Sequence, residues 1–423
     1  MFQPNLFDGF EATDGITAGV KERKERGQQI AALATIEKEG GFYIVPSVTS
    51  PRPTKYKVRY SSGKQTCTCP DHEQRGCKCK HIYAVECILT RETTHHADGS
   101  TTVKESVTVK QTRKTYSQNW PAYNEAQTHE KAEFQALLAD LCRNLPTPPQ
   151  QGRGQRRLPM SDAVFAVVFK IYSTFSARRF ASDLCDAQAK GYIAKVPHFN
   201  SVLNYLEDES LFPILCDLIE KSAMPLRSVE SQFAVDSTGF AFSRFDRWYD
   251  VKYNRFTQVQ RWVKAHLCCG TKTNVVTAVE IHEQNTNDAP ILPPLVESTA
   301  QRFDVKEVSA DKGYSSRDNH DAIAAVGATP YVMFKANATG NVGGLFGKMF
   351  HYFNFQRDTF LDHYHRRSNI ESTVMMVKSK FGDSVRSKTE VAAKNEVLCK
   401  VLAHNICCLI SALYELGIEA QFA

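Results

Sequence analysis

The sequence predicts an α/β protein of two or three domains, and three observations lead to this prediction. The chain of 423 residues exceeds the roughly 250 to 300 residues at which a single core stops growing. Its 42% hydrophobic and 23% charged residues are typical of a globular protein with a sizeable core. From about Val229 onward, strand-like and helix-like stretches alternate, which predicts a mixed sheet accompanied by helices.

Changes in composition divide the chain into successive parts. The first residues are polar and poorly periodic, a cysteine-rich stretch with short strand patterns follows, and a segment rich in threonine, serine and charge comes next. We therefore expect a mobile tail (1–28), a small α+β module (29–92), a linker (93–123), a helical region (124–228) and a mixed-sheet domain (229–410).

Strands of the mixed-sheet domain are predicted where apolar and β-branched residues run between turn residues. These stretches are SQFAVDSTGFAF, WVKAHLCCG, NVVTAVEIHE, DVKEVSADKGY and TPYVMFKAN. Helices are predicted at SDAVFAVVFKIYSTF, SARRFASDLCDAQAKG and SLFPILCDLIEKSA, because their apolar residues recur at helical spacing. The glycine-rich segment from Ala336 to Thr359 is expected to be a mobile linker.

The net charge and the N-terminal sequence exclude few classes of function. The formal net charge of +6 is compatible with nucleic acid without requiring it, and arginines cluster at Arg153, Arg156 and Arg157. The chain shows no signal-peptide pattern and no long uncharged apolar run, so we expect a cytoplasmic location and no membrane. The 13 cysteines of so large a chain are expected to be reduced thiols.

Four metal-ligand side chains cluster in the small module. Cys67-x-Cys69 is followed, after nine residues, by Cys79-x-His81. Three thiolates and one imidazole form the closed tetrahedral set that structural zinc prefers, and an ion there would tie a hairpin to a helix. His72 and Cys77 lie inside the loop and remain alternative ligands. An unmetallated cluster of reduced cysteines is the other interpretation.

This pattern resembles the SWIM zinc finger, in which C-x-C is followed by a variable gap and then C-x-H. The resemblance covers about residues 40–92. It implies one structural Zn²⁺ ion in a module that binds either DNA or a protein partner.

A second constellation lies near the C-terminus, in HYHRRSNIESTVMMVKSKFG. Tyr364, Arg367, Glu371 and Lys378 stand at offsets 0, 3, 7 and 14, which an α-helix places within an arc of roughly 60°. One helix face would then carry a phenol, a guanidinium, a carboxylate and an ammonium. A solvated, salt-bridged helix face would show the same pattern.

The spacing Y-x2-R-x3-E-x6-K resembles the signature of bacterial insertion-sequence transposases with a DDE catalytic triad. Such enzymes also carry one aspartate on an early strand and another after a later strand, and here AVDSTGF and VSADKGYSS contain Asp236 and Asp311. The resemblance spans about residues 160–410. It implies an RNase H-like mixed-sheet catalytic domain in which Asp236, Asp311 and Glu371 are the catalytic residues.

The same resemblance implies a DNA transposase that performs metal-dependent cleavage at the element's ends and strand transfer into target DNA. The three carboxylates would bind two Mg²⁺ ions, which Mn²⁺ can replace, and Tyr364, Arg367 and Lys378 would contact DNA. Its partners would be double-stranded terminal repeats and target DNA, with a homodimer or higher oligomer holding both ends. The helical region (124–228) would then serve DNA binding or dimerisation. An RNase H-like nuclease that cuts without rejoining remains an alternative, as does a domesticated DNA-binding protein that relies on the zinc module.

Overall fold

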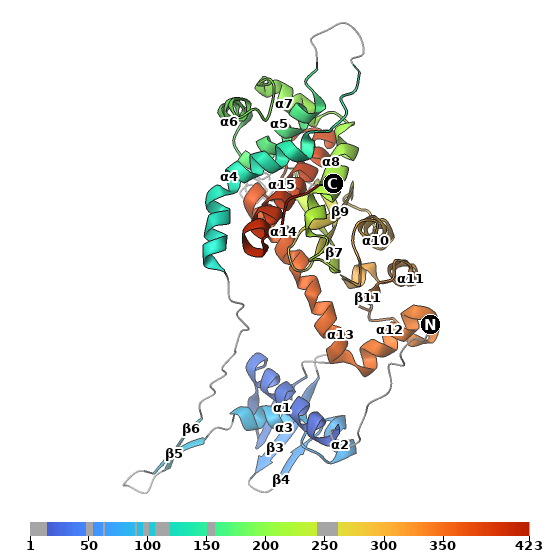
Figure 1. Ribbon diagram of the computed structural model, residues 1–423. Coiled ribbons are helices and arrows are strands. Elements are labelled where there is room, and N and C mark those ends of the chain that lie inside the picture. The colour runs from blue at the N-terminus through green and yellow to red at the C-terminus, as the bar shows by residue number, and fades with distance from the viewer. Residues whose placement is uncertain are drawn as a thin grey trace. The chain divides into compact units, whose positions relative to one another are not determined.

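The computed structural model describes most of the chain as two compact units. The described residues are 15–47, 54–61, 64–88, 91–95, 101–105, 119–149, 157–242 and 261–422. The units are Met1–Tyr116 and Ser117–Ala423, and each is described by itself (Figure 1). Arg153 and Arg156 of the expected arginine cluster lie outside the described residues, whereas Arg157 pairs with Asp208 at 3.8 Å.

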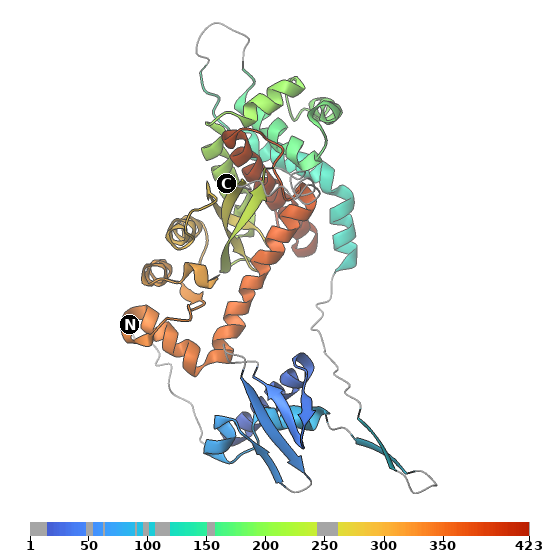
Figure 2. The ribbon, with the colours of Figure 1, turned by 180° about the vertical axis from the view of Figure 1, so that it is seen from behind.

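The first unit is built on a four-stranded antiparallel sheet in the order β1-β2-β3-β4. Its strands are β1 (Glu37–Glu39), β2 (Phe42–Pro46), β3 (Lys55–Ser61) and β4 (Lys64–Cys67). Helices α1 (Gly15–Leu33) and α3 (Lys80–Ile88) pack against each other on one face of this sheet, and the short α2 (Pro70–Arg75) follows β4 (Figure 2). The core of the unit includes Ile30, Val45, Val58, Ile82 and Val85.

Helix α1 corrects the expectation of a mobile tail up to residue 28. Its polar sequence has little helical periodicity, so the helix depends on packing against α3. Gly27 permits a close approach, because a Cβ there would lie 2.5 Å from the Cβ of Tyr83. Ile30 adds buried apolar surface from the following turn. Residues 1–14, the rest of the expected tail, lie outside the described residues.

The expected linker over residues 93–123 contains regular structure at both ends. Strands β5 (Arg91–His95) and β6 (Thr101–Glu105) pair as an antiparallel two-stranded sheet. Helix α4 (Trp120–Cys142) begins at its other end, and Asn119 caps it by accepting the backbone N–H of Ala122. The part between, residues 106–118, lies outside the described residues.

The second unit combines the helical region and the mixed sheet around one core, although the composition had suggested two domains. The helices of the first part are α4, α5 (Met160–Ser173), α6 (Ala177–Ala189), α7 (Phe199–Leu206), α8 (Leu211–Ala223) and the 3-10 turn η1 (Met224–Leu226). The long helix α15 (Glu390–Leu416) packs against α4, α5 and α8, and also against the sheet. Apolar residues of both parts therefore belong to one continuous cluster.

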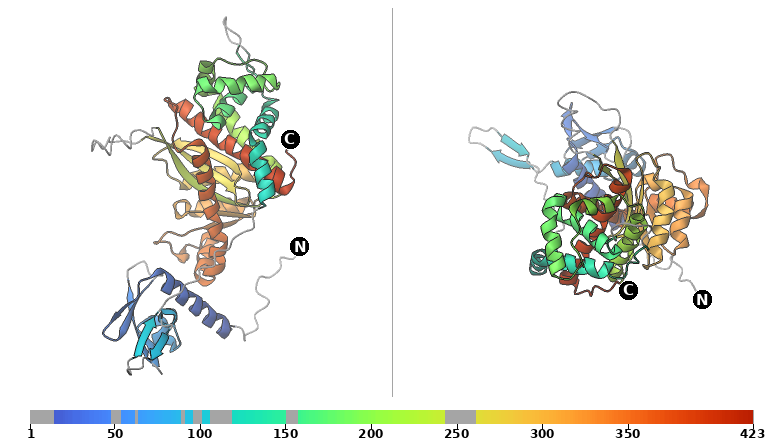
Figure 3. Two further views of the ribbon diagram at one scale, coloured as in Figure 1. Left: turned by 90° about the vertical axis from the view of Figure 1, so that its left-hand side faces the viewer. Right: turned by 90° about the horizontal axis from the view of Figure 1, so that it is seen from above.

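A five-stranded mixed sheet forms the centre of the second unit, in the order β11-β10-β7-β8-β9 (Figure 3). Its strands are β7 (Gln232–Ala241), β8 (Trp262–Gly270), β9 (Val276–Glu283), β10 (Glu307–Ala310) and β11 (Thr329–Val332). The first three pair antiparallel, whereas β10 is parallel to both β7 and β11. All of the predicted strands are thus present, and β7 occupies the centre.

Helices cover both faces of this sheet. On one side lie α10 (Leu292–Ala300), preceded by the 3-10 turn η2 (Ala289–Ile291), and α11 (Arg317–Ala325). On the other side lie α14 (Ser368–Phe381) and α15, as the opposite views of Figures 1 and 2 show. The sheet is therefore buried on both faces, which suits its nearly continuous apolar strands.

The segment from Ala336 to Thr359 is largely helical, which corrects the expectation of a mobile glycine-rich linker. It contains the 3-10 turn η4 (Gly340–Val342) and α12 (Gly344–Phe355), and α13 (Arg357–Tyr364) begins inside it. Its aromatic residues pack in a separate apolar cluster around Phe334, Met349 and Phe360. Aromatic burial therefore outweighs the conformational freedom of the glycines.

By length and composition alone, α15 could cross a membrane. Its most apolar window, however, is 78% buried inside the fold. Contacts with α4, α5 and α8 account for this burial. We therefore regard α15 as the central core helix of the second unit.

Candidate active site and zinc centre

Asp236 and Asp311 come together because of the register between two neighbouring parallel strands. Asp236 lies in the middle of the central strand β7, and Asp311 directly follows β10. Ala310 pairs with Val235, so the residues that follow them, Asp311 and Asp236, stand side by side where β10 ends. The structure thus joins two aspartates that are far apart in the sequence.

Glu371 reaches the same place from the first turn of α14. Ile370, Val377 and Phe381 of this helix are buried, and the helix packs on β7 and β8. The Thr373 hydroxyl donates to the Asn274 side chain at 3.1 Å, which further anchors the helix at the end of β8. The Glu371 side chain projects from a neighbouring face of the helix and is 60% exposed, so it remains accessible to a ligand.

Arg367 links the two carboxylates that come from β7 and α14. Its Nη1 donates to Asp236 Oδ2 at 2.9 Å, and its Nη2 donates to Glu371 Oε1. The guanidinium lies 6.0 Å from the centre of the Tyr364 ring. Arg367, which was expected to contact DNA, thus bonds two of the carboxylates, and Tyr364 lies beside its guanidinium.

The pKa of the Asp236 carboxyl is affected by burial and by the other charged groups around it. Burial is the main cause that raises the pKa of this carboxyl above its ordinary value, and the nearby charges of Asp311 and Glu371 raise it further. The backbone N–H of Ser237, at 2.8 Å, and the Arg367 guanidinium oppose this shift. A divalent cation would stabilise the charged form of such a group.

A buried hydrogen bond holds the turn that carries Asp311. The 3-10 turn η3 (Lys312–Tyr314) follows this aspartate, and the Tyr314 hydroxyl lies 3.0 Å from His266 Nδ1. His266 sits on β8 opposite Ser237, the neighbour of Asp236. The pair therefore connects the Asp311 turn to the strand beside Asp236. His266 is a residue that the sequence alone did not indicate, because a single histidine in an apolar strand is ambiguous.

A close neighbour leaves little room beside the glycine of the same turn. A Cβ at Gly313 would lie 3.2 Å from Asp288 Oδ2. Asp288 in turn pairs with Lys264 of β8 at 2.6 Å. The D-K-G-Y sequence thus places its glycine beside Asp288 and its tyrosine against His266.

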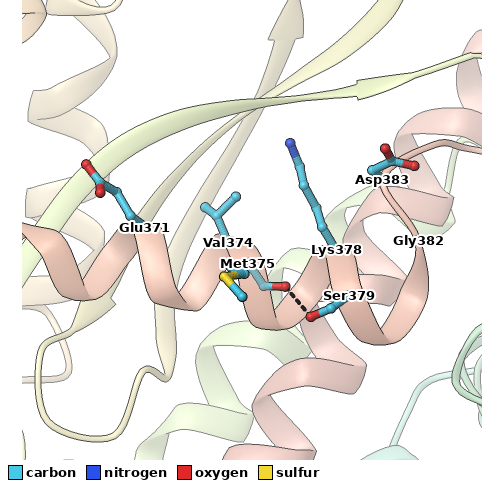
Figure 4. Close-up of a pocket in the computed structure, with 7 residues that line it drawn as sticks. All are labelled: Glu371, Val374, Met375, Lys378, Ser379, Gly382 and Asp383. Carbon is cyan, nitrogen blue, oxygen red and sulfur yellow. Dashed lines mark hydrogen bonds between the residues drawn. The ribbon is translucent and has the colours of Figure 1, made fainter. Parts of the chain in front are cut away.

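An open groove runs along α14 away from Glu371 (Figure 4). Its volume is about 620 Å³, and it is lined by Glu371, Val374, Met375, Lys378, Ser379, Gly382 and Asp383. Figure 4 shows Glu371 and Lys378 extending from α14 at separate points of the groove. The Lys378 ammonium lies 5.3 Å from the centre of the Phe240 ring, on the strand that also carries Asp236.

The four residues of the predicted helix face do not lie on one regular α-helix. α13 ends at Tyr364, the 3-10 turn η5 (His365–Arg367) follows, and α14 begins at Ser368. A 3-10 turn is more tightly wound than an α-helix, which changes the facing of Tyr364 relative to Glu371. The structure nevertheless gathers Tyr364, Arg367 and Glu371 around Asp236, with Lys378 farther along the groove.

The carboxylates offer the donor set of a hard divalent cation. Asp236, Asp311 and Glu371 supply only oxygen ligands, as Mg²⁺ prefers. Among the described residues, the group whose ligand atoms converge within 4.8 Å is the cysteine–histidine group, whereas Asp236 and Glu371 each bond the Arg367 guanidinium. The cluster thus already contains one positive group between two of its anions, which fits a site for cations.

The predicted zinc ligands converge in the first unit. Potential ligand atoms of Cys67, Cys69, Cys79 and His81 all lie within 4.8 Å of one another, and all four residues are buried. Cys67 ends β4, Cys69 caps α2, and Cys79 and His81 flank the first residue of α3. His81 Nδ1 faces the sulfur atoms, at 3.8 Å from Cys67 and 3.9 Å from Cys79. The group fits one tetrahedral zinc ion.

The two alternative ligands within the loop have other roles. His72 Nδ1 donates to the backbone carbonyl of Cys77 at 2.7 Å and so closes the loop. Neither residue belongs to the converging group. The hydrogen bond between Cys67 and Cys79 is the main cause that lowers the pKa of the Cys79 thiol and raises that of Cys67, so Cys79 is the first of the two to become a thiolate.

Each of these sites lies in a region that matches a protein-family model. Residues 227–406 match the family model described as a transposase DDE domain, and this range contains Asp236, Asp311 and Glu371. Residues 56–86 match the SWIM zinc finger, and this range contains all four converging ligands. The chain therefore combines a region similar to DDE transposases with a region similar to SWIM zinc fingers.

One solved structure shows a weaker likeness. The piggyBac transposase synaptic complex with hairpin DNA, determined by cryo-EM, is similar with a TM-score of 0.34 and 11% sequence identity. The likeness covers 71% of this chain and 77% of that chain. At this level the likeness supports no conclusion about fold or function.

Proposed function

We propose that the chain is a DNA transposase that cleaves DNA at the ends of its element and joins those ends to target DNA. One observation carries this proposal: the parallel register of β10 and β7 sets Asp311 beside Asp236, and Arg367 bonds both Asp236 and Glu371. Family similarity over residues 227–406 supports the same class. Three carboxylates from separate elements thus meet at one place.

The fold that we propose for residues 229–410 is RNase H-like. The sheet order β11-β10-β7-β8-β9 supports it, with three antiparallel strands followed by two parallel ones. In this arrangement the first aspartate lies on the central strand and the second directly follows its parallel neighbour. Asp236 and Asp311 occupy these two positions, which supports the proposed fold.

In this proposal Asp236, Asp311 and Glu371 hold two Mg²⁺ ions, which Mn²⁺ can replace. Such ions would activate the attacking oxygen and stabilise the leaving oxygen of a phosphodiester. Burial of Asp236 makes its charged form depend on neighbouring cations, which couples metal binding to this residue. Tyr314 and His266 hold the Asp311 turn in position, because their hydrogen bond ties it to β8.

Arg367 and Lys378 have distinct parts in substrate binding. Arg367 neutralises Asp236 and Glu371 when no DNA is bound, and its guanidinium would turn to a phosphate once ions occupy the carboxylates. Lys378 lines the groove that begins at Glu371 and would hold the DNA backbone there. Tyr364 packs beside Arg367 and would limit where its guanidinium can lie.

Joining two DNA ends requires both ends to be held at once, so we propose a dimer or higher oligomer on DNA.

Cleavage of a duplex carrying the element's own ends tests this proposal. We expect nicking that requires Mg²⁺ or Mn²⁺ and that falls by at least about 1,000-fold in both Asp236→Asn and Glu371→Gln. Asp383→Asn is the matched control, because Asp383 is exposed on the same groove but lies outside the triad. Equal nicking by all variants would show that the chemistry takes place elsewhere.

A labelled 3′ end then separates transposition from simple cutting. A transposase would transfer the label to target DNA, whereas a nuclease of the same fold would release it without joining. Cleavage without any joined product would therefore support the three carboxylates as an active site. It would contradict the proposal that the chain is a transposase.

A further inference from the structure

The sheet of the zinc module has one face that the helices α1 and α3 do not cover (Figure 2). Strand alternation in β3 sends Tyr56, Val58 and Tyr60 toward the core on the helical side. The intervening residues point to the other side and are all exposed. They are Lys55, Lys57 and Arg59, and we call them the basic row.

The basic row has no acidic partner among the described residues, whose ion pairs in this unit involve other side chains. Arg59 lies 5.6 Å from the centre of the Phe42 ring on the neighbouring strand, which holds its guanidinium over the sheet. Lys55 and Lys57 extend from the same strand at the regular two-residue repeat of about 7 Å. Three unneutralised cations therefore stand in a line.

Two threonine hydroxyls of β4 accompany this row on the same face. Thr66 pairs with Arg59, and Thr68 Oγ1 accepts the backbone N–H of Lys57 at 3.0 Å. Both threonines are exposed. Cys67 lies between them and points inward to the zinc ligands, so an ion held there would also keep both hydroxyls directed outward.

The other edge of this face carries opposite charge. Register places Glu37 beside Ile44 and Glu39 beside Phe42, so both carboxylates share the face of the basic row. They lie on β1, two strands from β3, which is about 10 Å away. The face is therefore polarised, with cations and hydroxyls along β3 and β4 and anions at the edge of β1.

We propose that this face, along β3 and β4, binds the phosphate backbone of duplex DNA. Regularly spaced cations suit the regular phosphates of DNA, and serine and threonine hydroxyls commonly bond phosphate oxygens. The acidic edge would repel the duplex and so direct it away from β1. The DNA is the element DNA of the proposed transposase, and in that respect this assignment rests on the proposed function.

An acidic protein fits the same face less well. Stable protein interfaces need a buried apolar or aromatic anchor at their centre. On this face Ile44 is already buried, Phe42 is partly covered with Arg59 above it, and Pro46 is partly buried. The fully exposed side chains of the face are charged or hydroxylic, which favours phosphate over a protein surface.

DNA binding by the full chain tests the assignment, measured as fluorescence anisotropy of a labelled duplex over a range of salt concentrations. All proteins carry Glu371→Gln, so that cleavage is not part of the readout. We expect Lys55→Gln/Lys57→Gln/Arg59→Gln to weaken binding roughly 100-fold at physiological salt. The slope of log affinity against log salt should fall by about 1 for each of the three contacts.

The matched control removes the same charge from the helical side of the module. Lys24, Arg75 and Lys78 are exposed on α1, at the end of α2 and before α3. We expect Lys24→Gln/Arg75→Gln/Lys78→Gln to lower affinity far less than loss of the basic row. Equal losses in the two triple variants would overturn the assignment, because net charge and not this face would then be responsible.

Two further variants keep the test independent of whether the first triple variant folds. Lys55→Arg/Lys57→Arg/Arg59→Lys preserves charge and should bind with wild-type affinity and zinc content. Glu37→Gln/Glu39→Gln removes the acidic edge and should tighten binding several-fold.

Unchanged affinity in the basic-row variant would overturn the DNA assignment and favour a protein partner for this face. These outcomes do not depend on catalysis. A chain that binds DNA through this face but never cuts it would refute the proposed transposase and leave the assignment standing.

Discussion

The two units hold their candidate metal sites in opposite ways. The zinc ligands lie in one short stretch, Cys67 to His81, and connect the elements of a small core. The three carboxylates come from β7, the end of β10 and α14, which a large apolar core already holds in position. In the first unit the ion would stabilise the fold, whereas in the second the fold positions the ions.

Removal of zinc should give the largest difference in stability between the two units. A structural zinc ion contributes on the order of 10 kcal/mol to a module of this size, so a strong chelator or Cys79→Ser should unfold the first unit. The second unit should remain folded. All three tryptophans, Trp120, Trp248 and Trp262, belong to it, so their fluorescence reports on that unit alone.

Circular dichroism would follow the loss of the first unit in the same experiment. A chelator that unfolds both units at one concentration would contradict the comparison. So would a chelator that unfolds neither unit after all of the zinc has been removed.

Acid should destabilise the second unit through His266. Burial lowers the pKa of His266 to about 4, with the nearby Lys264 cation adding to the effect, whereas an unfolded histidine titrates near 6.5. Between these values only the unfolded chain binds the proton, so the free energy of unfolding falls as the pH drops from about 6.5 to about 4. This residue should account for about 2 to 3 kcal/mol of that loss.

Urea unfolding followed by tryptophan fluorescence can measure this contribution. His266→Gln removes the titration, so the stability advantage of the wild type over this variant should shrink across the same pH interval. Both proteins keep the other histidines, so the contributions of those residues cancel in the comparison. Parallel pH profiles for the two proteins would show that His266 is not the titrating group.

Arg367 should matter to stability until a cation replaces it. Arg367→Gln leaves Asp236 and Glu371 without the guanidinium between them, which should lower the stability of the second unit by about 2 kcal/mol. Mg²⁺ or Mn²⁺ should restore more stability in this variant than in the wild type, because the ions would bind the folded state.

Arg366→Gln is the matched control for this prediction. Arg366 pairs with Glu307 at 2.8 Å and does not bond the triad, so its loss should not be rescued by divalent ions. Thermal denaturation at increasing Mg²⁺ concentration makes the comparison. Equal rescue of both variants would place the cation site away from Asp236.

Tyr314 should give the smallest effect on stability. Tyr314→Phe loses one buried hydrogen bond to His266 and should cost about 1 kcal/mol. Cleavage should slow more than this loss alone implies, because the turn after Asp311 becomes less constrained. Tyr331→Phe on the edge strand β11 serves as the control, and a cleavage rate that falls equally in both would argue against a role for the turn.

Sequence alone was sufficient where local pattern determines the structure. Trp262–Gly270 forms a strand over the predicted residues, and the four zinc ligands converge as their spacing indicated. The aspartates were indicated only by resemblance, since nothing in AVDSTGF or VSADKGYSS shows by itself that parallel strands bring them together. Their roles in catalysis and DNA binding stay predictions.

The features that the sequence did not predict depend on tertiary contacts. Helix α1 depends on the close contact of Gly27 with Tyr83, and α12 depends on aromatic packing around Phe334. His266 gains its meaning from Tyr314, which is distant in the sequence. Such contacts between separate parts of the chain leave no periodic pattern that a single sequence can reveal.

The catalytic metal can be located by replacing Mg²⁺ with Fe²⁺ and adding hydrogen peroxide and ascorbate, which generate hydroxyl radicals at the ion that cut the backbone nearby. We expect cuts near Asp236, Asp311 and Glu371 that excess Mg²⁺ suppresses and that Asp236→Asn abolishes. Cuts at other positions, or cuts at these positions that persist in Asp236→Asn, would contradict the assignment of the three carboxylates as the active site.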